Sequence, residues 1–476
     1  MKIALLALVV TGGLGFAAWQ PADRSTKKPH TAGASTYRDR FAQTQTNLTA
    51  TGASSCASSM CHGGATPRPG EVFLGIEYDL WYDRGQGTHF RAYKVLYEDE
   101  RSDRMAKLLF GPNAVAKDQA ACRTCHAFDV EPRRHGRAFD IEDGVSCEAC
   151  HGRSEKWNGP HQNPRVWRKE LTDDQRTKQG FYDTRNLVRR AEQCLACHLG
   201  VGDKSFGHRM LAAGHPPLTF ELAGDLFNVP KHWRDEQSYI RPDEGSWFHV
   251  RVWAVGQAVT LREEMRKLAS WAASDADVDY AVFECYACHH DLTVPSWRQR
   301  REVVGKLGEP VWNAATWAMC GVLLDLLTSE QRDEIRKQVD RIGRSLNIRS
   351  ADRAAVRSAA ESVASLASVL AERASQTTFD RAATFRMIRS LTRDRERIAQ
   401  LGYRAGVQTF SALYALYRLG IAESGSVPDN HTAILGALGN LRDLLYDAQR
   451  NERAGDYDAL ALAKILAELE RLLAGV

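Results

Sequence analysis

Ten of the eleven cysteines in this 476-residue chain fall into five close pairs, and each pair is followed at once by a histidine. Four pairs have the spacing C-x-x-C-H, whereas the first has four residues between its sulfurs. The paired cysteines are Cys56 and Cys61, Cys122 and Cys125, Cys147 and Cys150, Cys194 and Cys197, and Cys285 and Cys288. The histidines that follow them are His62, His126, His151, His198 and His289. The pattern indicates a chemistry that uses two thiols and one imidazole together.

Covalent attachment of haem c uses these three groups, because two thiols add to the vinyl groups and the adjacent imidazole binds the iron. Redox C-x-x-C motifs and structural zinc sites have similar cysteine spacing, but neither requires a histidine directly after every second cysteine. The sequence therefore predicts five covalently attached haem c groups. The site at Cys56 is the least regular, since its longer insert must loop out before both thioethers can form.

The second axial ligand of each iron separates electron transfer from chemistry at the metal, because a second histidine closes the iron. Of the fifteen histidines, ten lie outside the motifs, and eight of these fall between His89 and His290. We predict the distal ligands among His89, His161, His215, His249, His135 and His208, the last two competing for one haem. His232 is less favoured, and His290 is expected to be exposed or to support a ligand.

Local context supports four of these candidates. His89 begins a short helical pattern, His161 follows the turn residues Gly159 and Pro160, and His215 lies between a glycine and a proline. His249 lies on an apolar stripe of a helix predicted over 247–273. A buried imidazole there needs a partner, and iron would supply one.

The N-terminus has the form of a secretory signal, because Met1 and Lys2 precede an apolar run over 3–19. We predict a signal peptide over 1–22, with an uncleaved membrane anchor as the alternative. The protein is then periplasmic, either soluble or tethered at its N-terminus. A net charge of only +4 argues against a nucleic-acid partner. Cys320, the cysteine outside the pairs, is predicted to be a buried core thiol.

The composition divides the rest of the chain into three parts. Residues 23–50 are rich in Ser, Thr and Lys and indicate a flexible linker, and residues 51–300 hold the haem motifs with little strand patterning. From 301 to 476 apolar residues recur at helical spacing, and Thr328 begins a capping box. The predicted fold is mainly α, a multihaem cytochrome domain with little regular sheet followed by an all-α helical bundle domain.

The region from about 56 to 297 resembles the cytochrome c554 family of multihaem cytochromes. The resemblance rests on Gly144-Val-Ser-Cys-Glu-Ala-Cys-His-Gly152 with His161 after it, and on Trp81 with Thr88-His89, Ala92 and Leu96. It implies electron transfer between periplasmic partners through stacked haems. The chain departs from the family in its stretched first motif, its fifth motif and its helical extension. The arrangement of the haems and the presence of a five-coordinate haem therefore stay open.

These features favour a periplasmic electron carrier with bis-histidine haems and redox proteins as partners. An oxidoreductase acting on a small nitrogen or sulfur compound at one five-coordinate haem is the alternative, and whether the protein is an enzyme stays open at this point. A third interpretation is a subunit that relays electrons only inside a larger complex, with the C-terminal helices as its docking surface. No catalytic nucleophile or acid–base group stands out in the sequence.

Overall fold

The computed structural model describes residues 37–71, 73–82, 89–202, 204, 206–229, 231–234, 240–241, 245–289, 309–422, 424–425, 427–448, 453 and 457–474. The predicted signal peptide and the first part of the predicted linker lie outside these residues. The structure is 66% helical, and its described part contains no sheet beyond two isolated bridges, Ala50 with His135 and Phe283 with Trp312. The predicted mainly-α fold is confirmed.

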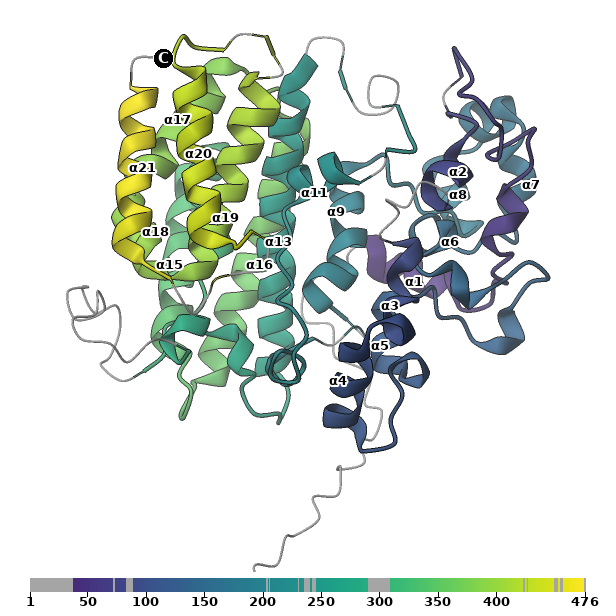
Figure 1. Cartoon of the computed structure of the whole chain (residues 1–476), viewed down its shortest axis with the longest axis horizontal. Helices are drawn as coiled ribbons and strands as arrows, with labels where there is room; N and C mark the ends of the chain where they lie inside the picture. Colours follow the sequence, from purple (N-terminus) through teal and green to yellow (C-terminus); the bar gives the residue numbers. More distant parts are fainter. Residues whose placement is uncertain are drawn as a thin grey trace, which may run out of the picture.

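Figure 1 shows two unlike parts, a bundle of long helices and a looser group of short helices that holds most of the motifs. The bundle is formed by helices from the second half of the chain. Its helices are α13 (Phe248–Ala272), α14 (Ala315–Cys320), α15 (Ser329–Ser345), α16 (Arg353–Gln376), α17 (Arg381–Arg393), α18 (Arg395–Leu401), α19 (Tyr403–Leu413), α20 (His431–Leu445) and α21 (Ala459–Leu473).

Helix α13 lies inside this bundle, packed against α16 and α14. Residues around its whole circumference are buried, as expected for a helix that is apolar on all sides. The helix predicted over 247–273 is thus confirmed, but it shares one core with helices beyond residue 301. The bundle therefore begins before the boundary expected from composition.

Two local predictions for the bundle are confirmed. The Thr328 hydroxyl accepts a hydrogen bond from the Gln331 amide, and the Gln331 side chain accepts one from the Thr328 amide, which completes the capping box. Cys320 is fully buried, and its thiol donates to the carbonyl of Gln257. Among the described residues, α16 is the one helix long and apolar enough to cross a membrane, and it packs in the bundle core.

The other part consists of short helices joined by turns. They are α1 (Tyr37–Gln45), α2 (Glu77–Tyr82), α3 (Val95–Glu98), α4 (Glu100–Phe110), α5 (Ala120–His126), α6 (Cys147–His151), α7 (Asn158–His161), α8 (Asp173–Lys178), α9 (Leu187–Leu195), α10 (His208–Ala212) and α11 (Leu222–Asn228). Helices α9 and α11 contribute residues to the apolar core of the bundle. The short-helix part has a small apolar cluster of its own, built around Tyr93, Leu96 and Ala106. Large planar cofactors would supply the apolar surface that so small a cluster lacks.

The predicted linker is wrong over its last residues, because Tyr37–Gln45 form the helix α1. Phe41 is buried and packs edge-on against Tyr182, with ring centroids 4.8 Å apart. The Asp39 carboxylate also accepts a hydrogen bond from Arg266 of α13 at 2.5 Å. The polar composition indicated a linker, but two aromatic residues and one carboxylate provide enough contacts to hold this segment in place.

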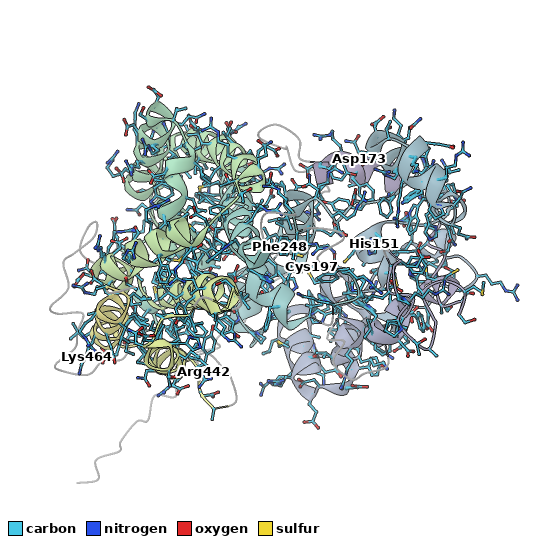
Figure 2. The ribbon with its side chains drawn as sticks, turned by 90° about the horizontal axis from the view of Figure 1, so that it is seen from above. His151, Asp173, Cys197, Phe248, Arg442 and Lys464 are labelled. Atoms are coloured by element: carbon cyan, nitrogen blue, oxygen red, sulfur yellow. The ribbon has the colours of Figure 1, made fainter. Side chains whose placement is uncertain are left out.

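A buried ion pair joins the two parts of the molecule. Arg262 of α13 donates to Glu192 of α9 at 2.7 Å, and the two side chains are 6% and 4% exposed. Arg262 also donates to Glu263 at 2.8 Å. Helix α9 ends one residue after Cys194, so this pair fixes a haem motif against the bundle. Helix α13 also contacts the turn Ala196–Gly200, which contains Cys197, and Figure 2 labels this cysteine where the bundle and the short helices adjoin.

Candidate haem sites

Each of the five motif histidines faces one histidine from elsewhere in the chain. The ring centroids are 6.2 Å apart for His62 and His161, 6.2 Å for His126 and His215, 6.4 Å for His151 and His232, 6.0 Å for His198 and His89, and 6.1 Å for His289 and His208. An ion bound to two imidazole nitrogens, at about 2 Å from each, holds the ring centroids about 6 Å apart. The five separations therefore fit a metal between each pair.

Hydrogen bonds orient several of these rings. Nδ1 of His126 lies 2.9 Å from the Ala92 carbonyl, Nδ1 of His161 lies 2.5 Å from the Asn158 carbonyl, and Nδ1 of His215 lies 2.7 Å from the Pro216 carbonyl. Because a carbonyl oxygen only accepts, Nδ1 carries the proton in each ring. The other nitrogen, Nε2, is left with a lone pair for a metal. Nδ1 of His62 is held instead by Glu77 Oε2 at 3.1 Å.

The stretched first motif closes on itself as a loop. The His62 amide donates to the Cys56 carbonyl at 3.3 Å, and the Cys61 amide donates to the Ser58 carbonyl at 2.8 Å. Met60, one of the extra residues, is 77% exposed. The insert thus points into solvent, as predicted, and leaves His62 directed at His161.

Burial sets the protonation state of the motif groups. It lowers the pKa of His151 and His198 to about 4, and it also lowers the pKa of His89, His126 and His161. Neutral imidazole is the form that binds metal. Burial raises the pKa of the Cys150 thiol to about 11, so this thiol is not a thiolate nucleophile at neutral pH. None of the eleven cysteines forms a disulfide.

Polar atoms beside the imidazole pairs also fit a bound haem. The Tyr82 hydroxyl and the Trp157 indole nitrogen are buried and have no hydrogen-bond partner within the described part of the chain. Trp157 lies edge-on to His161, with centroids 5.2 Å apart, and Cys147 is the thiol with the strongest electrostatic effect on Tyr82. Buried polar atoms of this kind normally have partners, which the polar edges of a porphyrin would provide. The residues present therefore fit haem c.

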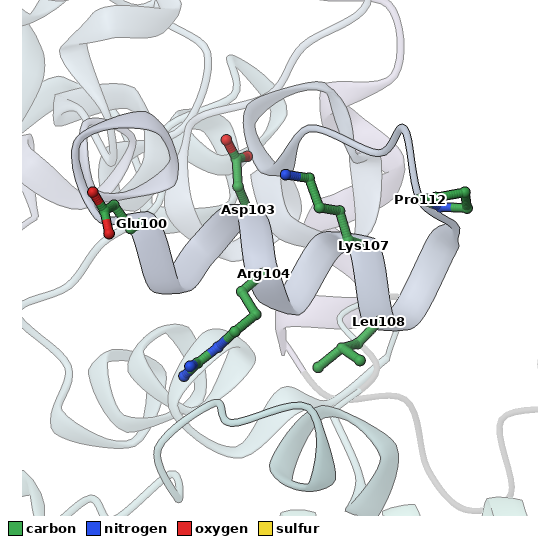
Figure 3. Close-up of a pocket in the computed structure, with 6 residues that line it drawn as sticks. All are labelled: Glu100, Asp103, Arg104, Lys107, Leu108 and Pro112. Atoms are coloured by element: carbon green, nitrogen blue, oxygen red, sulfur yellow. The ribbon is translucent and has the colours of Figure 1, made fainter.

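A haem iron needs only two ligands from the protein, because the porphyrin supplies the other four. A shallow hollow along α4, shown in Figure 3, is lined by Glu100, Asp103, Arg104, Lys107, Leu108 and Pro112. It contains no motif cysteine and no paired histidine, so it is separate from the five pairs.

Two predicted distal ligands, His135 and His249, do not face a motif histidine. His135 is 2.7 Å from the Val130 carbonyl through Nε2, which must therefore carry a proton, and its ring stacks on Phe139 at 4.0 Å. His249 lies on α13 with its ring 5.5 Å from that of Phe248. The apolar residues around His249 belong to the bundle core.

His232, which was less favoured than His249, faces His151, and His208, the competitor of His135 for one haem, faces His289. The neighbours of His232 in the sequence gave no helical or turn pattern that would have favoured it. The one local signal is the adjacent Trp233, whose ring lies 5.0 Å from the imidazole. The remaining candidates, His89, His161, His208 and His215, each face a motif histidine. His290 lies outside the described residues.

Aromatic rings connect three of the pairs. Trp81 stacks on His89 at 5.5 Å with an angle of 2° between the planes, and it lies edge-on to His232 at 5.0 Å. Its indole nitrogen donates to the Val145 carbonyl at 3.2 Å. Phe181 stacks on His151 and contacts Trp157, which contacts His161.

The other two pairs are connected by α10. His208 is the first residue of this helix, and His215 follows its last residue, Ala212, by three positions. The Asp279 carboxylate accepts a hydrogen bond from the His208 amide at 2.9 Å. The sites therefore form two connected groups, one of three sites and one of two.

Residues 55–152 match the family model for cytochrome c554 and c-prime. The match covers the first three motifs and His89, but it includes neither the last two motifs nor the bundle. No curated protein and no solved structure matches the chain. The match over segment 55–152 therefore supports a c-type cytochrome in electron transfer and implies covalently bound haem.

Proposed function

We propose that this protein is a periplasmic pentahaem electron carrier in which every iron has two histidine ligands. The observation that carries the proposal is the set of five imidazole pairs, each joining one motif histidine to one distant histidine. His62, His126, His151, His198 and His289 are the proximal ligands. Their distal partners are, in the same order, His161, His215, His232, His89 and His208.

The bound haems supply reversible one-electron exchange. The protein holds both axial positions with neutral imidazoles, and aromatic side chains cover the rings. A substrate-reducing or substrate-oxidising haem needs one open axial position. Because all five motif histidines face a second imidazole, the pairing favours the carrier over the alternative of an oxidoreductase for a small nitrogen or sulfur compound.

The route for electrons follows the contacts between the pairs. Trp81 and Phe181 join the sites of His62, His151 and His198, and α10 joins the sites of His126 and His289. On this proposal the donor and acceptor are redox proteins of the periplasm. The apolar N-terminal run would direct export, either as a cleaved signal or as a membrane tether.

Electron paramagnetic resonance of the oxidised protein tests the proposal, combined with mass measurement of the number of attached haems. We expect five haems, all low-spin. The imidazole planes are nearly parallel for His62 and His161, at 6°, but they are 77° to 89° apart in three other pairs. Parallel planes give a rhombic low-spin spectrum, and perpendicular planes give a signal with one very large g-value, so both types should appear. A high-spin iron in the intact protein would overturn the assignment.

A further inference from the structure

The fifth haem motif is attached to the C-terminal bundle. Just before the motif, Phe283 forms an antiparallel bridge with Trp312, and the Glu284 amide donates to the Val311 carbonyl at 2.9 Å. The Asn313 amide donates to the Val282 carbonyl at 3.0 Å. The chain entering the motif is therefore paired with the segment that leads into α14.

Glu284 contacts the start of a second element as well. Its carboxylate accepts a hydrogen bond from the Tyr286 amide, at the start of the 3-10 turn Cys285–Ala287. The same carboxylate interacts with the backbone amides of Tyr403 and Arg404, the first two residues of α19. Glu284 is only 6% exposed. One buried carboxylate thus lies at the N-termini of both the haem motif and a bundle helix, where a negative charge is stabilised.

The fit around this carboxylate is close. Gly402 precedes α19 with φ +102°, and a Cβ added there would lie 2.6 Å from Cδ of Glu284. An added side chain would displace the Glu284 carboxylate from the start of α19, and it would also strain the backbone at this positive φ. The absence of a side chain at Gly402 is therefore what allows the motif and α19 to approach each other.

A residue of the motif itself belongs to the bundle core. Tyr286, between the two cysteines, is 4% exposed and lies edge-on to Tyr457 at 5.7 Å. The Tyr457 hydroxyl donates to the Ala399 carbonyl of α18 at 2.7 Å. The position of the motif is thus set by helices of the last third of the chain.

The distal ligand of this site comes from the short-helix part. His208 is held by Asp279 through its backbone amide, and its ring contacts Tyr280 at 5.5 Å. The fifth site consequently forms only where the bundle presents His289 to His208.

We propose that the C-terminal bundle holds the fifth haem motif in place. Glu284 is the residue that positions this motif, so that His208 can bind the iron of the fifth haem. This inference rests on the proposed function, and it gives the bundle a role inside the electron route. This role of the bundle does not depend on the docking surface that was predicted for the C-terminal helices. Glu284 acts through the backbone of the motif and does not itself contact iron.

Gly402→Ala in the full-length haem-loaded protein tests the inference. The added Cβ should displace the motif from α19, so that His208 no longer reaches the iron and one of five haems becomes high-spin. Gly425→Ala is the matched control, because Gly425 also has a positive φ, +73°, but an added Cβ there meets nothing within 4 Å. His208→Ala identifies the signal, since it removes the same ligand directly. The Gly402→Ala spectrum should match that of His208→Ala, and the double variant should add no second high-spin iron.

The inference is overturned if Gly402→Ala lowers the unfolding temperature but keeps all five haems low-spin. If Gly402→Ala does not fold, Glu284→Gln replaces it, because glutamine keeps the shape of the side chain and removes its charge. That variant should alter only the low-spin signal that His208→Ala removes, and an unchanged signal counts against the inference. A high-spin iron in the unsubstituted protein would instead contradict the proposed function, so the two failures are distinguishable.

Discussion

Replacing His232 with alanine should convert one of the five haem irons from low-spin to high-spin. The His151 and His232 rings are 6.4 Å apart, and an alanine side chain is too short to span the remaining distance to a metal. The nearest other imidazoles, those of His62 and His161, already face each other. The iron at His151 should therefore keep one protein ligand, and the integrated low-spin signal should fall from five irons to four.

Two assays measure this change independently. Electron paramagnetic resonance counts the high-spin iron in the oxidised protein, and carbon monoxide titration of the reduced protein should show one binding equivalent per chain. His249→Ala and His135→Ala are the controls, because neither ring faces a motif histidine, and both variants should keep five low-spin irons. The reasoning is refuted if His249→Ala produces the high-spin iron and His232→Ala does not.

Two further substitutions test other contacts. Arg262→Met leaves Glu192 buried without its main partner and should lower the free energy of unfolding by about 3–5 kcal/mol near neutral pH. Burial already raises the pKa of the Glu192 carboxyl above 4.5, and loss of Arg262 should raise this pKa further. The folded variant therefore binds a proton at Glu192 more strongly than the unfolded chain does. The destabilisation should therefore shrink as the pH falls toward 4.5, and a pH-independent loss would contradict this origin. Trp81→Ala should change the resonance signals of the haems ligated by His89 and His232 together, while Trp81→Phe should keep them; a change at one haem alone would contradict a shared contact.

The haem attachment motifs could be predicted from the sequence because they are local, with both thiols and the proximal imidazole inside one short segment. The proposed distal ligands depend on tertiary contacts between distant segments, such as His89 with His198. Local context pointed to His89, His161 and His215, which lie beside turns or at the start of helical patterns. The same reasoning favoured His249, whose ring faces no motif histidine among the described residues, because a buried stripe identifies a packed helix face but not what packs against it.

The fold shows the same limit. Periodicity predicted the helix over 247–273 and the capping box at Thr328, since both depend on residues near in sequence. It could not show that α13 joins the bundle rather than the haem region, because that depends on which apolar surfaces meet. Segment 37–45 was predicted as part of a linker from its polar composition. The contacts that hold it in place are with Tyr182 and Arg266, far along the chain, and composition does not reveal them.

Helix α10 lies next to the proposed distal ligands of two different irons. His208 is its first residue, and His215 lies three residues beyond its last residue, after Gly214 at φ +106°. A displacement of α10 would therefore move both imidazoles. On the proposed ligand assignment, it would alter the bonds from distal histidines to two irons together.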